Sequence, residues 1–201
     1  MMDKSKFFDH FRRTLAAPTL EQGEVDGANA ILDCMWGLPN SWISYGLATA
    51  WHETAHTLQP IKESGGDAYF FRRYDRDGQH PAIAKQLGNT QKGDGVKFCG
   101  RGFVQLSGRA NYLRAGTALK IDLISNPELA LDPAIAAKIM RDGMVEGWFT
   151  GRKLAHILPV SSPATRNEFF SARRIINGSD RADLIAGYAM EFQHALCATE
   201  K

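Results

Sequence analysis

The sequence has little cysteine, and the spacing of its three cysteines argues against two kinds of stabilised domain. Cys34, Cys99 and Cys197 lie far apart, and no C-x-x-C pair occurs. A disulfide framework needs an even set of cysteines, and a structural zinc site needs closely spaced thiolates. We therefore expect free thiols, buried as free cysteines usually are.

Two further absences narrow the class of protein. No stretch approaches the roughly 18 apolar residues of a membrane-spanning helix, and residues 1–18 lack the unbroken apolar core of a signal peptide. The formal net charge of +2 is too small to indicate a nucleic-acid partner. We expect a chain made in a cytoplasm, with no integral membrane segment and no nucleic acid bound.

The residues that are present have the composition of one globular domain. Apolar residues make up 44% and charged residues 23% of the 201 residues, which is typical of soluble domains. This length suffices for a substantial core, and no internal repeat or low-complexity linker divides it. The sequence therefore predicts a single domain over residues 1–201.

Helical periodicity marks both ends of the chain. In the N-terminal part we expect helices over 5–15, ended by Pro18; from a capping box at Thr19–Gln22 to Gly37; and over 40–59, capped by Asn40. In the C-terminal part we expect helices over 108–119, capped by Ser107; 133–149, opened by Asp132; 163–177; and about 179–198, with Leu184 facing inward.

Between residues 61 and 106 the helical period is lost and glycine is dense. The strand-like and turn-like pieces of this stretch are Tyr69–Phe71, Phe103–Gln105, Asp77-Gly78 and Asp94-Gly95. We expect a smaller lobe of loops and a β-hairpin, inserted between helical parts 1–60 and 107–201. A domain interrupted in this way leaves a groove between its lobes, in which a long substrate can lie.

Glu53 is the most informative residue of the helical parts. It is expected at the edge of the apolar stripe of helix 40–59, beside Trp51, with His52 and His56 pointing roughly the other way. An apolar setting can keep a carboxyl group protonated, so that it donates its proton to a leaving glycosidic oxygen. A second, ionised carboxylate must then act as nucleophile or as base for a water.

Glu63 is the candidate for that second carboxylate. It follows Glu53 by ten residues and can face it across the groove if the chain turns at Pro60. A separation of roughly 6.5–9.5 Å would leave room for a water and would invert the anomeric centre. Asp67 and Asp75 are alternative bases, and an exposed loop carboxylate without a role is the plain alternative for Glu63.

The segment HETAH, from His52 to His56, supports a different class of enzyme. In H-E-x-x-H the two histidines, four apart on a helix, bind zinc, and the glutamate acts on the metal's water. The extended motif wants histidine where this chain has Lys62. Glu146 or Glu168 stays open as a third ligand, so the residues alone leave a zinc hydrolase in play.

Four segments, in order, resemble glycoside hydrolase family 19. They are Trp51-His52-Glu53-Thr54, Glu63 ahead of Tyr69-Phe70-Phe71, GRGFVQLS from Gly100 to Ser107 with Asn111, and ARRIINGSD from Ala172. They cover about residues 45 to 190, and the compact, cysteine-poor chain is most similar to the family's phage endolysin branch. The resemblance implies a mainly α, lysozyme-like and chitinase-like domain with a small glycine-rich lobe and an interlobe groove.

The resemblance also implies residue roles. Glu53 would be the general acid and Glu63 the general base, with no metal or other cofactor. The substrate would be bound by Gln105, Ser107, Asn111, Asn177, Arg101 and Tyr69. Arg101 and Arg174 would hold the acidic residues in place, and Ser107 would help to hold the attacking water.

What the resemblance implies about function is an inverting endolysin of the lysozyme type. It would hydrolyse the β-1,4 bonds of peptidoglycan glycan strands as a monomer. It would have no separate wall-binding domain, and it would leave the host bacterial cytoplasm for the periplasmic wall once the membrane is breached. A chitinase on the same fold, the zinc hydrolase using His52, Glu53 and His56, and a non-catalytic sugar-binding module remain alternatives. A transglycosylase, which would need only Glu53, is a further one.

Overall fold

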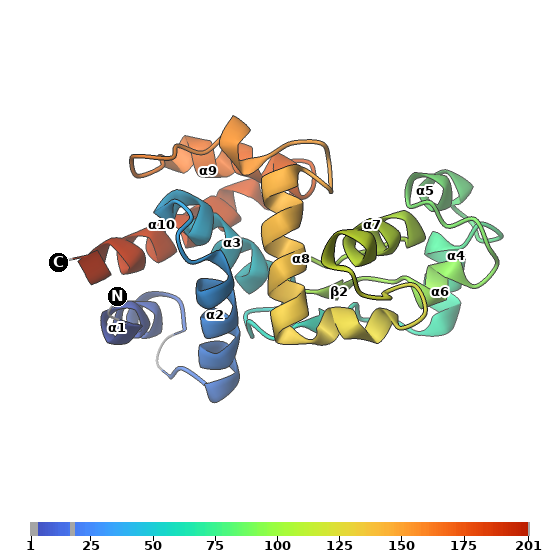
Figure 1. Cartoon of the computed structure of the whole chain (residues 1–201), viewed down its shortest axis with the longest axis horizontal. Helices are drawn as coiled ribbons and strands as arrows, with labels where there is room; N and C mark the ends of the chain where they lie inside the picture. The colour runs from blue at the N-terminus through green and yellow to red at the C-terminus, as the bar shows by residue number, and fades with distance from the viewer. Residues whose placement is uncertain (1–3, 17–18, 201) are drawn as a thin grey trace.

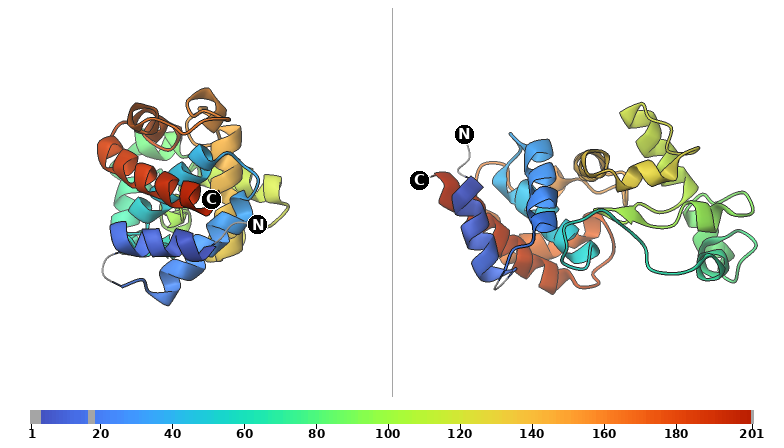
Figure 2. Two further views of the ribbon diagram at one scale, coloured as in Figure 1. Left: turned by 90° about the vertical axis from the view of Figure 1, so that its left-hand side faces the viewer. Right: turned by 90° about the horizontal axis from the view of Figure 1, so that it is seen from below.

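The computed structural model describes residues 4–16 and 19–200 and is mainly helical, as predicted (Figure 1). The expected stop at Pro18 lies outside the described residues. The larger lobe contains α1 (Lys4–Thr14), α2 (Gln22–Met35), α3 (Asn40–Glu53), α8 (Pro133–Glu146), α9 (Arg166–Ala172) and α10 (Ala182–Cys197). The smaller lobe contains β1 (Ile61–Lys62), α4 (Asp67–Tyr74), α5 (Pro81–Gln86), α6 (Asp94–Lys97), β2 (Arg101–Gly102) and α7 (Arg109–Leu119). In Figure 2 the smaller lobe lies at the opposite end of the molecule from the two ends of the described chain. Short 3-10 turns lie at η1 (Pro127–Leu131), η2 (Leu154–His156), η3 (Arg173–Ile175) and η4 (Ala198–Glu200).

Helix α3 is the centre of the larger lobe and is packed along α10. Every residue from Ser41 to Trp51 is buried, so the helix is surrounded rather than striped. Asn40 is its first residue and does not cap it, contrary to the prediction. The carbonyl of Pro39 accepts the N–H groups of Trp42 and Ile43, and Pro39 therefore takes the capping position.

The predicted helix 40–59 is too long, because α3 ends at Glu53. The Thr54 hydroxyl donates to the Ala50 carbonyl at 2.8 Å and accepts the Leu58 N–H at 2.9 Å. These bonds turn the chain into a tight coil in which Ala55, His56 and Leu58 have positive φ angles. A Cβ at Gly27 would stand 1.7 Å from the Leu58 carbonyl oxygen, so only glycine lets α2 pack against this coil.

Other helix boundaries follow from local capping. Asp132 caps α8 as predicted, with its Oδ1 accepting from Ala134 and Ile135. Three helices begin at other residues than predicted: α2 is capped by Glu21 with Glu24 and not by Thr19, α7 by Gly108 and not by Ser107, and α9 by Thr165 and not by Pro163. Two further boundaries also differ, since α8 ends before Gly147 and α10 begins at Ala182. Leu184 is 42% exposed and does not face inward.

The smaller lobe is more helical than the sequence predicts. Tyr69–Phe71 lies in α4 and not in a strand, because Phe70 packs at helical spacing on Tyr74, with ring centroids 6.4 Å apart. Phe103–Gln105 is a turn, and Asp94-Gly95 opens α6. The sheet is no simple hairpin: β1 and β2 pair antiparallel, Ile61 with Gly102, although α4, α5 and α6 lie between them in sequence.

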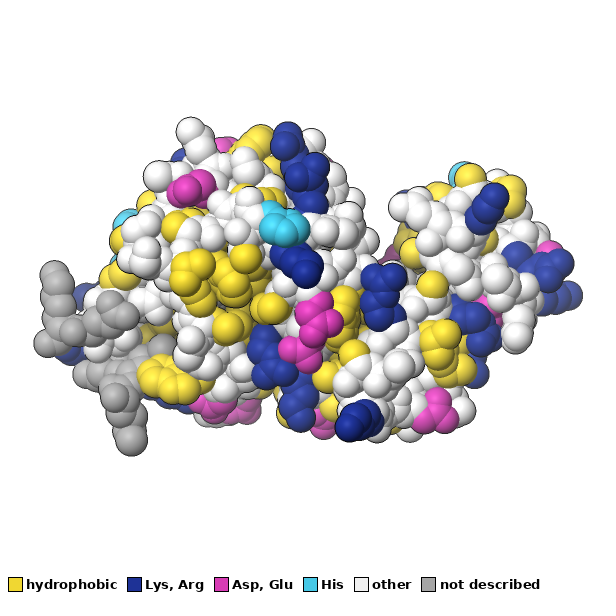
Figure 3. Space-filling view, turned by 45° about the horizontal axis from the view of Figure 1, so that its top comes forward, with side chains coloured by type: hydrophobic (Ala, Val, Ile, Leu, Met, Phe, Trp, Pro, Cys, Tyr) yellow, Lys and Arg dark blue, Asp and Glu magenta, His cyan; other side chains and the backbone are white. Residues whose placement is uncertain are grey.

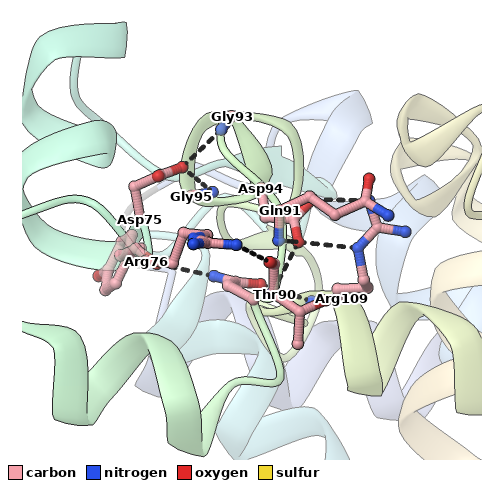
Figure 4. Close-up of polar contacts among 10 residues, drawn as sticks. Asp75, Arg76, Thr90, Gln91, Gly93, Asp94, Gly95 and Arg109 are labelled. Carbon is pink, nitrogen blue, oxygen red and sulfur yellow. Dashed lines mark hydrogen bonds and ion pairs between the residues drawn. The ribbon is translucent and has the colours of Figure 1, made fainter.

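Two buried carboxylates hold the smaller lobe together (Figure 4). Asp75, after α4, accepts the N–H groups of Gly93 and Gly95 through Oδ2. Asp94 accepts those of Thr90 and Gln91 and is bound by two nitrogens of Arg109, at 2.6 and 2.8 Å. Because Arg109 is the first residue of α7, this network joins α4, α6 and α7 into one body.

The cysteines and the apolar segments agree with the composition. All three cysteines are free thiols, with Cys99 buried and Cys34 and Cys197 half-buried. Burial raises the pKa of the Cys99 thiol. Over 4–16 and 19–200, no helix combines the length and the apolar character that crossing a bilayer requires.

The Asp94 network generates a stability prediction. We expect Asp94→Asn to lower the free energy of unfolding at pH 7 by about 1.5–3 kcal/mol, the usual value of hydrogen bonds to a charged group. The exposed Asp77→Asn change, in the same lobe, should stay within about 0.5 kcal/mol. Urea denaturation of both variants measures the difference.

The loss of stability caused by Asp94→Asn should also depend on pH. Burial acts to raise the pKa of Asp94, but bonds from Arg109 and from backbone N–H groups outweigh it and hold this pKa below its usual value. A lowered native pKa stabilises the fold fully above the unfolded pKa of about 3.9 and ceases to do so as the pH falls through the native value. The gap between wild type and Asp94→Asn should therefore narrow below about pH 4; a constant gap would contradict this account.

Candidate active site

A groove of about 910 Å³ lies between the two lobes, in the hollow visible in Figure 3. One wall is made by the end of α5, residues 104–107 and α7. The other is made by residues 148–152, after α8, and by 174–179, around and after η3. Four of the predicted substrate-binding residues line it: Gln105, Ser107, Asn111 and Asn177. Their location is thus the expected one, and their binding role stays a prediction.

The turn at Gln105 shapes the first wall. Gln105 has a φ of 52°, which is uncommon for a residue with a side chain. Its amide Nε2 donates to the Ile61 carbonyl at 3.0 Å, and its own carbonyl accepts the Ser107 hydroxyl at 2.9 Å. The Asn111 amide in turn donates to the Ser107 carbonyl at 2.8 Å. Three of the groove residues therefore support one another.

Glu53 lies at the end of α3, with its side chain 19% exposed. Its Oε1 accepts a hydrogen bond of 2.7 Å from Arg173, whose own side chain is only 3% exposed. The expected apolar setting is therefore wrong, since the carboxylate is paired with a buried guanidinium. Arg173 also donates to the Asp180 carbonyl at 3.1 Å, which ties Glu53 to the segment that forms the second wall.

The two arginines named from the sequence do not hold the predicted acid and base. Arg174 is exposed and lines the groove, while its neighbour Arg173 reaches Glu53. Arg101 is buried and binds Glu128 at 2.6 Å and the Tyr112 hydroxyl at 3.0 Å. Hydrogen bonds from Arg101 hold the pKa of Glu128 below its usual range. Arg101 thus fixes β2 in the fold, and the prediction that it binds substrate is wrong.

Glu63 directly follows β1 and is held by three bonds. Its N–H donates to the Gly100 carbonyl at 2.8 Å, its Oε2 accepts the Gly100 N–H at 3.2 Å, and its Oε1 accepts the Tyr74 hydroxyl at 2.7 Å. Burial, and then the hydrogen bond to Glu63, raise the pKa of Tyr74. The sequence gives no signal for Tyr74, because its contact with Glu63 depends on how α4 packs against the end of β1.

Gly100 connects Glu63 to the groove wall. A Cβ at this position would stand 3.2 Å from Glu63 Oε2 and 2.7 Å from Gln105 Oε1. The two side chains therefore flank the same point of the backbone, and a larger residue at Gly100 would displace one of them. Glu63 is thus adjacent to a residue that lines the groove.

The alternative bases and Tyr69 have distinct positions. Asp75 is fully buried and accepts backbone N–H groups, so it cannot act on a substrate, and that alternative is wrong. Asp67 is exposed in the first turn of α4. Tyr69 is half-buried, with its ring against those of Phe70 and Tyr74, 5.4 and 6.4 Å away. It supports the residue that holds Glu63, and it is not among the side chains that line the groove.

The zinc interpretation of HETAH required two histidines on one helical face, and α3 ends before His56. His56 has a φ of 68°, and its Nε2 lies 3.1 Å from the Tyr188 hydroxyl. Burial lowers the pKa of His52, although the neighbouring carboxylate acts in the opposite direction. Glu146 accepts from the indole N–H of Trp148, and Glu168 accepts the Thr165 N–H in the capping box of α9. The residues of this segment therefore do not form the predicted zinc site.

Two comparisons of sequence relate the chain to known chitinases. A family model described as "Chitinase class I", of the glycoside hydrolase 19 set, matches residues 41–152. Chitinase 8 from Oryza sativa subsp. japonica is 45% identical over 40 residues, which span 20% of this chain and 15% of that protein.

Solved structures share the fold. Chitinase C from Streptomyces griseus HUT6037 superposes with a TM-score of 0.62 at 21% identity, over 98% of this chain and 76% of its own. A bacterial family 19 chitinase superposes with a TM-score of 0.54 at 22% identity, over 97% of this chain and 94% of its own. The predicted lysozyme-like and chitinase-like fold class is confirmed.

The pair between Arg173 and Glu53 leads to a second prediction. Arg173→Gln should lower the free energy of unfolding by about 3 kcal/mol, near the lower end for breaking a buried ion pair, because Glu53 is partly exposed. Arg174→Gln, one residue away in the groove wall, should change it by less than about 0.5 kcal/mol. Denaturant melts compare the two, and equal effects would show that the buried pair does not stabilise the fold.

Proposed function

Because this chain belongs to glycoside hydrolase family 19, the class I chitinase family, we propose that it hydrolyses the β-1,4 bonds between the N-acetylated sugars of peptidoglycan. The observation that carries the proposal is the position of two carboxylates in separate lobes. Glu53 is fixed to the wall at 174–179 through Arg173, and Glu63 is fixed beside Gln105 in the opposite wall. Neither carboxylate is among the side chains that line the groove, but each is fixed to residues next to one of its walls. In the proposal a glycan strand bound between these walls reaches both carboxylates.

In this proposal the reaction follows the inverting two-carboxylate scheme. Glu53 gives its proton to the glycosidic oxygen as the bond to the anomeric carbon breaks. Glu63 takes a proton from a water whose oxygen bonds to that carbon on the opposite face. Arg173 then stabilises the carboxylate that Glu53 becomes, and Tyr74 and the Gly100 N–H orient the Glu63 oxygens.

The charge of the groove favours peptidoglycan over chitin. Arg114, Arg152 and Arg174 line it, and no Asp or Glu is among its lining residues in the described part of the chain. The peptide stems of peptidoglycan carry carboxylates, whereas chitin is uncharged, and a basic groove attracts an anionic polymer. Trp148 and Phe149, also in the lining, add apolar surface against which sugar rings can pack. Lysis of a bacterial host by an endolysin of this kind is part of the proposal.

The test is mass analysis of the products released from purified sacculi. We expect disaccharide-peptides with reducing ends at the β-1,4 positions, and much slower release from neutral chitin oligomers. Products with anhydro ends would show that the enzyme is a transglycosylase instead, and released peptides without sugar would show that it is a peptidase. Turnover of chitin oligomers but not of sacculi would leave the chitinase.

A variant separates the charge argument from the fold. Arg152→Gln should slow the release from sacculi and leave the rate on chitin oligomers unchanged, because only the first substrate is anionic. Arg72→Gln, an exposed arginine of α4 that does not line this groove, is the matched control. Equal slowing on both substrates would contradict a role for the charge.

A further inference from the structure

A group of three metal-ligand side chains lies on the larger lobe, outside the groove. His10 of α1 and Glu191 and His194 of α10 each place one ligand atom within 4.8 Å of the other two. We propose that these three residues bind a divalent transition metal ion of the zinc type, which clamps the N-terminal helix of the described chain to α10.

The chemistry of the set fits zinc. Two imidazole nitrogens and one carboxylate oxygen are ligands that zinc takes in proteins, with a water completing the tetrahedron. Magnesium and calcium prefer oxygen ligands in larger numbers, and the set does not offer them. Glu191 and His194 are three residues apart on one helix, and such residues lie on the same face.

The geometry is close to that of a bound site. Ligands about 2.0–2.1 Å from a tetrahedral zinc stand about 3.3 Å apart. His10 Nε2 already lies 3.1 Å from Glu191 Oε2. The rings of His10 and His194 meet edge to face, with centroids 6.3 Å apart. Small rotations of partly exposed side chains would bring the third ligand to the same distance.

The two helices that carry the ligands are held rigidly beneath them. Phe7 and Phe11 are the buried residues of α1. Both rings pack on Phe192 of α10, at centroid distances of 6.2 and 5.1 Å. This contact fixes His10 opposite Glu191, so the site needs no rearrangement of the backbone. Helix α1 and the C-terminal end of α10 lie at the end of the larger lobe away from the smaller lobe (Figures 1 and 2).

The plain alternative is a histidine–carboxylate ion pair without a metal. His10 and Glu191 are 26% and 36% exposed, and an ion pair this exposed adds at most about 1 kcal/mol. It gives His194 no part, whereas a metal site requires all three residues. A substitution of His194 therefore distinguishes a metal site from a simple ion pair.

The test is a titration of the untagged, chelator-treated protein with zinc chloride, followed by calorimetry and by the melting temperature Tm. We expect one zinc per chain at micromolar affinity and a higher Tm with zinc. His194→Ala, which removes an exposed ligand, should weaken binding at least about tenfold, since even partners outside a ligand set change metal affinity by about 10–100-fold. Glu191→Gln should do the same while keeping the shape of the side chain.

The control variant is His80→Ala, an exposed histidine of the smaller lobe, which should bind zinc as the wild type does. Magnesium chloride should give no heat and no change in Tm. The absence of zinc binding in the wild type would overturn the proposal. So would zinc binding that His194→Ala and Glu191→Gln leave unchanged, because the metal would then lie elsewhere.

Discussion

The ion pair between Arg173 and Glu53 is the constraint on which the candidate active site depends. A guanidinium this deeply buried is costly unless a carboxylate faces it, and Glu53 is the partner it has. The pair requires α3 to end where Glu53 can reach the segment after α9, and the tight coil that begins at Thr54 makes that possible. Through the Asp180 carbonyl the same guanidinium holds the segment that forms one wall of the groove. One guanidinium therefore holds both the Glu53 side chain and the segment next to this wall.

The opposite wall is positioned by a separate network. Glu63 is bound through Tyr74 and Gly100, and the residues around it belong to a lobe whose parts are joined by Asp75, Asp94 and Arg109 (Figure 4). In a two-carboxylate mechanism the separation of the carboxyl groups decides how water attacks. The buried carboxylates therefore help to fix the lobe that carries Glu63, together with buried rings such as Phe70, Phe98 and Tyr112.

Much of the site was predictable because its motifs are local. Gln105, Ser107 and Asn111 belong to one short segment, and the structure places them together in the groove. The predictions that the structure contradicts concern features that depend on long-range contacts or on helical register. The choice between Arg173 and Arg174 rests on the turn at η3, and the partner of Arg173 is 120 residues away in sequence. The sequence predicts a strand for the aromatic run of α4, because so short an apolar run has no clear period that would distinguish a helix from a strand.

The central claim is that Glu53 protonates the glycosidic oxygen, and the rate of bond cleavage by Glu53→Gln tests it most directly. Glutamine keeps the shape of the side chain and has no proton to donate as an acid. Reducing ends released from purified sacculi should fall by about 10²–10⁴-fold, the usual contribution of a general acid, while circular dichroism shows the variant folded. A folded Glu53→Gln protein that releases reducing ends at a rate close to that of the wild type would contradict the account.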